Sequence, residues 1–228
     1  MAVFAMGAVA AAEASAAEYI YKVAGAKLEA GQTKEIKSSM KSTTFVLKGK
    51  GVLNIESVTK CTALTLNAAE KPVIIGGKPG TSAKEKIEFT GCTATLGGAK
   101  CEKVEVENVV TNNEIVTVVL PATLKGRLAT LFTPGVGEVF SKVKFVKCGI
   151  FGSQKAEVKG KSAGLDEPKE PEEVKNWLVY ATGASEITEV EKSNKEKVKV
   201  ELTNESKKAT IEGEAWVELS TKEVWGVA

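Results

Sequence analysis

The four cysteines of the chain lie within one run of short alternating segments, and this combination most limits the folds that the chain can adopt. In the segment KIEFT, Ile87 and Phe89 share one face, while lysine, glutamate and threonine share the other. Side chains alternate along a strand with a period of two, so this pattern predicts a half-buried strand. Glycine-rich turns separate such segments between residues 43 and 148, where the cysteines are Cys61, Cys92, Cys101 and Cys148.

The segment CTATLGGAKC joins two alternating segments and is expected to form a hairpin. Its Gly-Gly pair permits the positive φ angles of a tight connection. If the loop is the four residues Thr95–Gly98, Cys92 lies directly opposite Cys101, at the cross-strand separation that a disulfide needs. We therefore predict a local Cys92–Cys101 disulfide.

Cys61 and Cys148 remain, and by elimination they form a second disulfide that ties an early strand to a late one. Four cysteines allow three connectivities, so different pairings stay open. The cysteines could instead be four buried free thiols, or they could bind a zinc ion. Zinc ligands usually come as closely spaced Cys-x2-Cys pairs, often with histidine, and the chain has neither.

The later part of the chain also favours strands. Residues 115–120 are nearly all apolar and β-branched, which is typical of a central strand buried on both faces, and Pro121 ends it because proline has no amide hydrogen. From Ala209 to Leu219, small or apolar residues alternate strictly with polar ones. Short strands with turns every ~10 residues predict an all-β fold, an antiparallel β-sandwich or barrel, with minor helix at the N-terminus or at Glu167–Trp177.

Residues 1–16 have the features of a signal peptide: an apolar run, then small residues, Ala14 and Ala16, before the cleavage site. The run is shorter than the ~20 apolar residues that span a bilayer, and no positive residue precedes it, which favours a leader truncated at its N-terminus. The segment could instead form an N-terminal helix of the fold. We predict export, no transmembrane segment after processing, and one β-rich domain at 17–228 with an acidic, proline-containing loop at 162–175.

Several segments resemble a family of secreted proteins of unknown function that occur in many copies in soil actinobacteria. The resemblance covers most of the chain from about Lys27, in KLEAGQTKEIKSSMKSTTFVLKGKG, IIGGKPGTSAKEKIEFTGCT, EIVTVVLPATLKGRL and ATIEGEAWVEL. The FTGC block and the later Lys-Cys-Gly strand end are its most specific parts. It implies export, a β-rich fold and paired cysteines, but no activity. The chain departs from the family in CEKVEVENVVTNNEIV, where many members have a stretch rich in glycine and proline.

The composition argues against most kinds of enzymatic catalysis. The chain has no histidine, the commonest general base and metal ligand, so we expect no catalytic residues, cofactor or metal site. Carboxylate pairs could still hydrolyse glycosides, but the glutamates alternate with lysines in a way typical of a solvated sheet face. The 31 basic and 29 acidic residues give a net charge of +2, which gives no reason to expect nucleic acid binding.

The tryptophans are the residues that invite a binding hypothesis. Trp216 lies on the polar face of its predicted strand, where it could stack on a sugar or be covered by the chain itself, and Trp177 is a second possible ligand contact. Trp225 is expected to dock the C-terminus. We expect a non-enzymatic secreted or cell-surface protein that acts on a protein or an envelope polymer through its surface. The alternative is a β-sandwich that binds carbohydrate or a small ligand through an exposed tryptophan.

Overall fold

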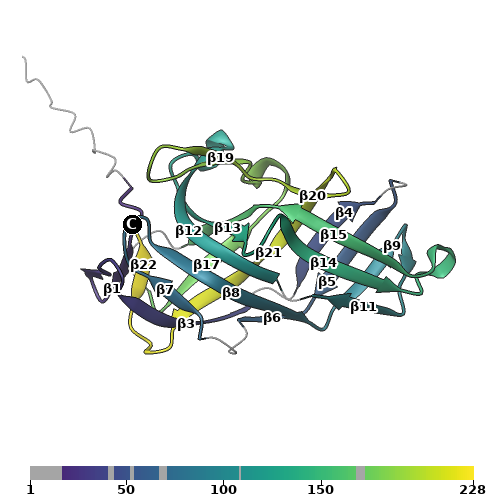
Figure 1. The fold of residues 1–228 in the computed structure, drawn as a ribbon, viewed down its shortest axis with the longest axis horizontal. Helices are drawn as coiled ribbons and strands as arrows, with labels where there is room; N and C mark the ends of the chain where they lie inside the picture. The colour runs from purple at the N-terminus through teal and green to yellow at the C-terminus, as the bar shows by residue number, and fades with distance from the viewer. Residues whose placement is uncertain (1–16, 41–43, 52–53, 67–70, 108, 168–172) are drawn as a thin grey trace, which may run out of the picture.

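The computed structural model of the chain describes residues 17–40, 44–51, 54–66, 71–107, 109–167 and 173–228, so the predicted signal peptide at 1–16 lies outside the described residues. Its largest sheet closes into an eight-stranded barrel with extra strands outside (Figure 1). Each pair of neighbouring strands in this barrel is antiparallel. The predicted all-β, barrel-like fold is therefore confirmed.

Seven places in the ring are each filled by one strand, and the eighth is shared. In ring order the single strands are β12 (Val109–Leu120), β13 (Leu128–Pro134), β16 (Ser162–Glu167), β17 (Lys175–Tyr180), β21 (Lys207–Leu219), β3 (Thr33–Met40) and β8 (Thr81–Thr90). Between β3 and β8, the place is filled in succession by β6 (Ala63–Leu66) and β7 (Val73–Ile75). Pairing of β8 with β12 closes the ring.

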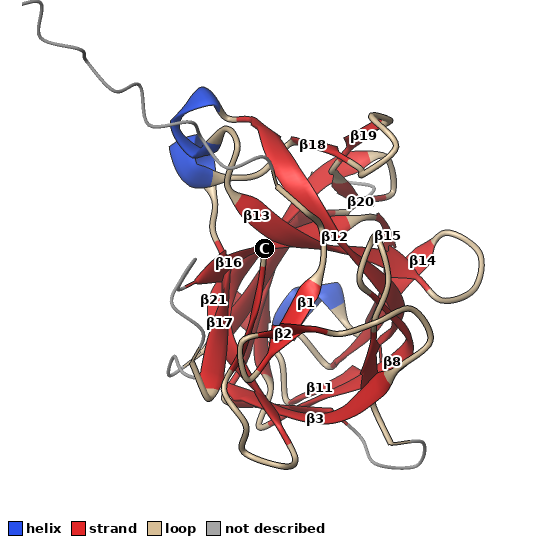
Figure 2. Cartoon of the chain, turned by 90° about the vertical axis from the view of Figure 1, so that its left-hand side faces the viewer, coloured by secondary structure: helices blue, strands red, loops and turns tan. Residues whose placement is uncertain are grey.

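A small sheet covers one end of the barrel. It consists of β2 (Ala26–Lys27), β1 (Tyr21–Val23) and β22 (Trp225–Val227), so both ends of the described chain meet there. In Figure 2, β1 and β2 lie across the end of the ring of strands that faces the viewer. Tyr21, Trp225 and Val227 are buried against the barrel strands at this end. Trp225 thus docks the C-terminus, as predicted.

Strand β21 continues beyond the barrel at the other end, where it carries two further sheets. Residues Lys207–Ala209 pair with β20, and Thr210–Glu212 pair with β4. One sheet contains β4 (Phe45–Lys50), β5 (Glu56–Cys61), β9 (Thr93–Leu96) and β10 (Ala99–Lys100). The other contains β20 (Leu202–Asn204), β15 (Gln154–Gly160), β14 (Val139–Val146) and β11 (Lys103–Val106). Apolar side chains of the two sheets, such as Leu96 and Phe145, share one core cluster.

Two further strands lie along β12. Strands β18 (Glu189–Glu191) and β19 (Lys197–Lys199) pair in series with the end of β12. Val116 and Val118 of β12 are buried beneath them, together with Val190 and Val198. The described helices are three short 3-10 turns, η1 (Ala122–Leu124), η2 (Gly149–Phe151) and η3 (Gly183–Ser185). Ile115 belongs to the core cluster at the covered end of the barrel, so the prediction of burial on both faces is confirmed for residues 115–118. It is wrong at the end of the strand, where Leu120 is 45% exposed.

The disulfides join Cys61 to Cys92 and Cys101 to Cys148, so the predicted pairs Cys92–Cys101 and Cys61–Cys148 are wrong. The error lies in the loop length. The hairpin turn is the two residues Gly97-Gly98, both at positive φ (57° and 81°), and not the four residues Thr95–Gly98. The shorter turn moves the register by two positions, so the amide of Cys101 donates to the carbonyl of Ala94 instead of facing Cys92.

Each cysteine meets a partner on a neighbouring strand outside its own hairpin. Lys60 pairs with Thr93, and this antiparallel register continued by one residue sets Cys61 opposite Cys92, with Cα atoms 4.0 Å apart. Lys103 pairs with Val146, and this register continued by two residues sets Cys101 opposite Cys148, with Cα atoms 3.9 Å apart. Both disulfides therefore lie across adjacent strands, and neither is the hairpin staple that the sequence predicted.

The predicted exposed loop at 162–175 is also wrong over its first part. Ser162–Glu167 forms strand β16, and its first five residues are buried. Both prolines and two of the acids that indicated a loop lie at 168–172, outside the described residues. Ser162–Leu165 consists of small or apolar residues, which suit a buried strand. Lys175–Trp177 belongs to strand β17, so the helix considered for Glu167–Trp177 does not form in these described residues.

Candidate functional site

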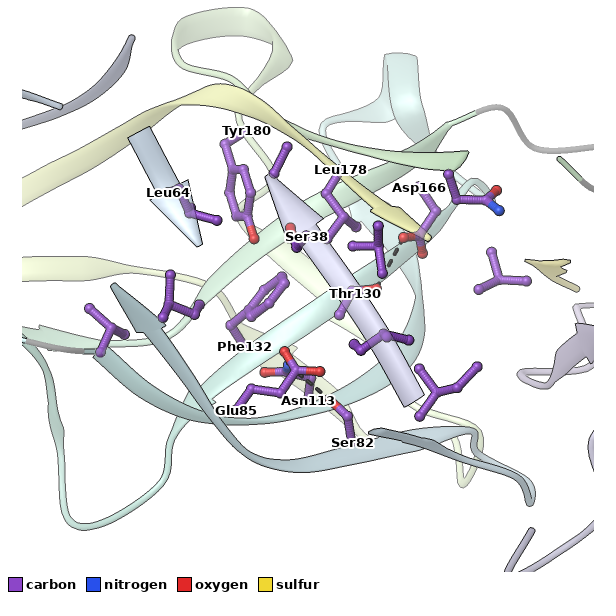
Figure 3. Close-up of a pocket in the computed structure, with 18 of the residues that line it drawn as sticks. Ser38, Leu64, Ser82, Glu85, Asn113, Thr130, Phe132, Asp166, Leu178 and Tyr180 are labelled. Atoms are coloured by element: carbon purple, nitrogen blue, oxygen red, sulfur yellow. Dashed lines mark hydrogen bonds between the residues drawn. The ribbon is translucent and has the colours of Figure 1, made fainter. Parts of the chain in front are cut away.

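The barrel encloses a cavity of about 60 Å³, which we call the lumen (Figure 3). This volume corresponds to roughly four water-sized positions at ~15 Å³ each. Most of the lining side chains are apolar or aromatic, and among the described residues no lysine or arginine lines the lumen. The polar lining residues are Ser38, Ser82, Glu85, Asn113, Thr130, Asp166 and Asn176. The aromatic lining residues that carry a polar atom are Tyr21, Tyr180 and Trp225.

Regular alternation places Glu85 on the lumen face with Ile87 and Phe89, and a bulge in β8 brings Ser82 to the same face. In the pairing of β8 with β12, Thr111 lies opposite Glu85 but Asn113 lies opposite Ser82, so β8 has one extra residue there. The extra residue turns Ser82 and Glu85 to the same side of the strand, although they are three positions apart. Both are buried and both contact Asn113: its Nδ2 donates to Ser82 Oγ at 3.0 Å and to Glu85 Oε2 at 2.5 Å.

Asp166 enters the lumen from β16, on the other side of the ring. It is 6% exposed, and its Oδ1 accepts a hydrogen bond of 3.0 Å from Thr130 Oγ1 on the neighbouring strand β13. Asp166 is the only aspartate in the chain, where the other 28 acidic residues (29 less this one) are glutamates. Figure 3 shows Asp166 beside Thr130, with Asn113, Glu85 and Ser82 grouped lower in the same view.

Three polar atoms of the lumen have no hydrogen-bond partner among the described residues. They are Asp166 Oδ2, Asn113 Oδ1 and Trp225 Nε1, and each belongs to a side chain that is at most 6% exposed. Buried polar atoms in proteins nearly always have a partner, because an unpaired one costs roughly 1–3 kcal/mol. Two acceptors and one donor, all on side chains that line the lumen, therefore lack a partner in the part of the chain that the structure describes.

Burial changes the protonation of both lumen carboxyls. It raises the pKa of Glu85 to about 7, and the hydrogen bonds from Ser82 and Asn113 oppose this rise. It also raises the pKa of Asp166 to about 7, against the opposing hydrogen bond from Thr130. Burial, and then the charges of both carboxylates, raise the pKa of Tyr21 and of Tyr180 well above the usual value. Both acids therefore contribute to the raised pKa values of the same two tyrosines.

Tyr180 fits into the lumen because its two cross-strand neighbours are glycines. Gly164 on β16 and Gly213 on β21 lie beside Tyr180 on either side of β17. A Cβ on Gly164 would lie 3.0 Å from Tyr180 Cζ, so a larger residue would push the ring aside. The ring packs at 5.5 Å from that of Phe45 and at 5.6 Å from that of Phe132 (centroid distances), and these rings form an aromatic wall on one side of the lumen.

The two tryptophans proposed as ligand contacts are brought together, but outside the lumen. Trp177 and Trp216 are directly opposite each other on β17 and β21, on the outer face of the barrel. Each is only half-buried. The ammonium group of Lys175 lies 4.2 Å from the centre of the Trp216 ring, which covers part of the face that a sugar would use. Trp225 is the tryptophan that lines the lumen.

Sequence reasoning missed Glu85, Asn113 and Asp166, although two signals pointed to them. Ile87 and Phe89 were predicted to face inward, and the same alternation traced back two residues places Glu85 on that apolar face. The only aspartate of the chain was assigned to a loop on the basis of the acids and prolines that follow it.

A second, more open cavity of about 360 Å³ lies at the opposite end, between the two sheets that extend from β21. Its walls are mainly apolar and include Ile55, Leu96, Phe145 and Phe151, and exposed Gln154 and Lys155 border it. One of its atoms, Asn204 Oδ1, is buried with no hydrogen-bond partner among the described residues. The lumen differs from this cavity because three such atoms and two carboxyls meet there.

Within the described ranges, no group of three or more histidine, cysteine or acidic residues could hold a metal ion. No helix in the same part of the chain has the length and apolar character needed to cross a membrane. Comparison of the chain with protein-family models, with curated proteins and with solved structures found no match. The function must therefore be argued from the residues of the chain itself, and the lumen is the site at which they are most unusual.

Proposed function

We propose that the chain is an exported, non-enzymatic protein that binds a small molecule in the lumen of its barrel. The observation that carries the proposal is the group of three buried atoms that have no partner among the described residues, Asp166 Oδ2, Asn113 Oδ1 and Trp225 Nε1. Small-molecule sites are typically apolar cavities with a few polar groups that converge on the ligand, and the lumen has this composition.

The disulfides support export. Both Cys61–Cys92 and Cys101–Cys148 are formed, which is typical of an oxidising environment outside the cytoplasm. Each holds the edges of two adjacent strands together in the sheets that extend from the barrel. The predicted compartment, secreted or at the cell surface, is part of the same proposal.

Cavity size favours binding over catalysis. Two carboxyls in one cavity could hydrolyse a glycoside, since glycosidases use such a pair. A hexose has ~12 non-hydrogen atoms, about three times as many as the roughly four water-sized positions in about 60 Å³ can hold. The lumen is therefore too small for a saccharide, and the chain has no histidine that could act with a nucleophile.

Surface interaction with a protein or an envelope polymer is the second candidate function. Trp177 and Trp216 lie side by side on the outer face, which favours it, but Lys175 covers part of the Trp216 ring. The two functions predict different binding sites. A ligand of the lumen contacts Trp225 and Tyr180, whereas a polymer on the outer face contacts Trp177 and Trp216.

The test is a screen of the full chain by NMR, with the indole N–H signals of the tryptophans as reporters. The probes are neutral, anionic and cationic compounds of four or five non-hydrogen atoms, and soluble cell-wall polysaccharides. We expect some small probe to shift the Trp225 signal in the wild type but not in Ala215→Leu, because Ala215 lines the lumen and leucine would fill it. Ala122→Leu, at an exposed position, is the matched control. Shifts confined to Trp177 and Trp216, or no shift at all, would contradict the proposal.

A further inference from the structure

We infer that the ligand of the lumen is a small organic cation, an alkylammonium ion held by the carboxylates of Glu85 and Asp166. This inference rests on the proposed function and names the class of ligand. It starts from the charges in the lumen, which are all negative: the two carboxyls line it, and among the described residues no lysine or arginine does. Buried charges in proteins are normally paired, since an isolated one is costly.

The hydrogen-bonding groups also favour a donor. Glu85 Oε2 already accepts from Asn113, and Asp166 Oδ1 accepts from Thr130, so each acid is fixed in position by a neighbouring strand. Asp166 Oδ2 and Asn113 Oδ1 are buried acceptors without a partner among the described residues. An ammonium group has only donors, so it matches these acceptors, whereas a carboxylate ligand would face like charge.

The aromatic wall completes the chemistry of the site. The rings of Phe45, Phe132 and Tyr180 pack together on one side of the lumen, while Tyr21 and Trp225 pack at the end covered by β1, with centroids 6.0 Å apart. Aromatic ring faces attract organic cations, most strongly where water is excluded. A cation with a short alkyl chain therefore satisfies the acids and the apolar lining together.

The titratable groups of the lumen predict how binding depends on pH. Glu85 and Asp166 have pKa values of about 7, and the other titratable side chains that line the cavity, Tyr21 and Tyr180, are neutral in this range because their pKa values are raised. A cation requires at least one carboxyl to be ionised. Binding should therefore weaken by about tenfold from pH 8 to pH 6 if one proton is displaced, and by more if two are.

The experiment compares n-propylammonium with 1-propanol and propionate, which have similar size but different charge. Titration of the full chain at pH 8, followed at the Trp225 indole N–H, should show binding of propylammonium that is at least tenfold tighter than binding of propanol. Glu85→Gln and Asp166→Asn should each weaken propylammonium binding by tenfold or more and leave propanol binding within about twofold. Glu138→Gln, at an exposed glutamate, should change neither.

The possible outcomes separate the ligand class from the proposed function. If propanol or propionate binds as well as propylammonium, or if potassium chloride at the same ionic strength competes fully, the ligand class is wrong while the barrel remains a binding site. If no probe shifts Trp225 and only ordered water occupies the lumen, both proposals fail. If a carboxyl variant does not fold, the wild-type comparison of pH 8 with pH 6 decides, and equal affinities would overturn the inference.

Discussion

Asn113 donates its side-chain amide to the carboxyl of Glu85 over 2.5 Å, inside a barrel whose lumen holds no positive side chain among the described residues. The bulge in β8 brings Ser82 to the face of Glu85, so that the same amide also donates to Ser82 Oγ. The contact with Asn113 fixes an acid in a position that is otherwise unfavourable, since burial alone raises the pKa of Glu85. Hydrogen bonding thus offsets part of the cost of burial, and the remainder affects stability.

The first prediction is that the protein becomes less stable as the pH rises from 5 to 8. In the folded chain the pKa values of Glu85 and Asp166 are about 7, against 4.5 and 3.8 as ordinary values. Over this range the folded state binds more protons than the unfolded state, so the free energy of unfolding falls with pH and levels off above about pH 8. The full shifts correspond to roughly 3 kcal/mol for Glu85 and 4 kcal/mol for Asp166. Denaturant titrations at pH 5, 6, 7 and 8 measure this slope.

Other shifted carboxyls do not interfere in this pH window. Hydrogen bonds from lysines lower the pKa values of Glu35, Glu105 and Glu212, so their stabilising effect is lost only as the pH falls below about 4.5. Glu85→Gln should flatten the slope between pH 5 and 8, while the exposed variant Glu138→Gln keeps it. A wild-type stability that rises with pH in this window would rule out the buried, ionisable pair.

The second prediction concerns the space around Tyr180. Gly164→Ala should destabilise the fold by about 1–3 kcal/mol, because its Cβ would lie 3.0 Å from Tyr180 Cζ in a packed interior. Gly49→Ala on strand β4 is the matched control, since its Cβ would lie 3.5 Å from Ala209 and Asn204, an ordinary van der Waals distance. Combining Gly164→Ala with Tyr180→Leu should recover part of the loss in a double-mutant cycle. If the losses of stability in the two single variants simply add, Gly164 does not act by making room for the Tyr180 ring.

Periodicity in the sequence was enough to predict the class of fold and most inward faces. The strict alternation from Ala209 to Leu219 places its small and apolar residues inside, as observed along β21. The nearly continuous apolar segment 115–120 is buried on both faces over residues 115–118, because β18 and β19 cover its outer side there. These features depend on local side-chain pattern, which a sequence carries directly.

The disulfide pairs and the lumen could not be predicted in the same way because they depend on strand neighbours. A two-residue turn in place of a four-residue loop was enough to separate Cys92 from Cys101. Asn113 meets Ser82 through a bulge and Glu85 across two paired strands, and Asp166 meets Thr130 across a strand pair that is distant in sequence. Such contacts depend on strand register and on the order of strands in the ring, and local alternation along one strand predicts neither.

The third prediction tests the outer tryptophans. Lys175→Gln should cost at most about 1 kcal/mol, the size of an exposed cation–π contact, and should make Trp216 more accessible. Acrylamide quenching of tryptophan fluorescence should rise relative to the wild type and to Lys155→Gln, an exposed substitution outside this contact. If the variant also gains binding to a polysaccharide, Lys175 limits a carbohydrate surface. Unchanged quenching would mean that the lysine does not cover the ring in solution.

The last prediction concerns the two disulfides. Peptide mapping of the non-reduced protein should give Cys61–Cys92 and Cys101–Cys148, which lie 31 and 47 positions apart. Chain entropy assigns each bond about 4 kcal/mol, and the longer loop adds only ~0.4 kcal/mol. Replacing the Cys101–Cys148 pair by alanines should nevertheless cost clearly more, because both residues are buried in a core cluster whereas Cys92 is only half-buried. Melting both double variants beside the reduced wild type separates loss of the bond from loss of packing. Recovery of a Cys92–Cys101 peptide would contradict the strand neighbours described above. Equal losses of stability in both variants would contradict the stronger packing of Cys101 and Cys148.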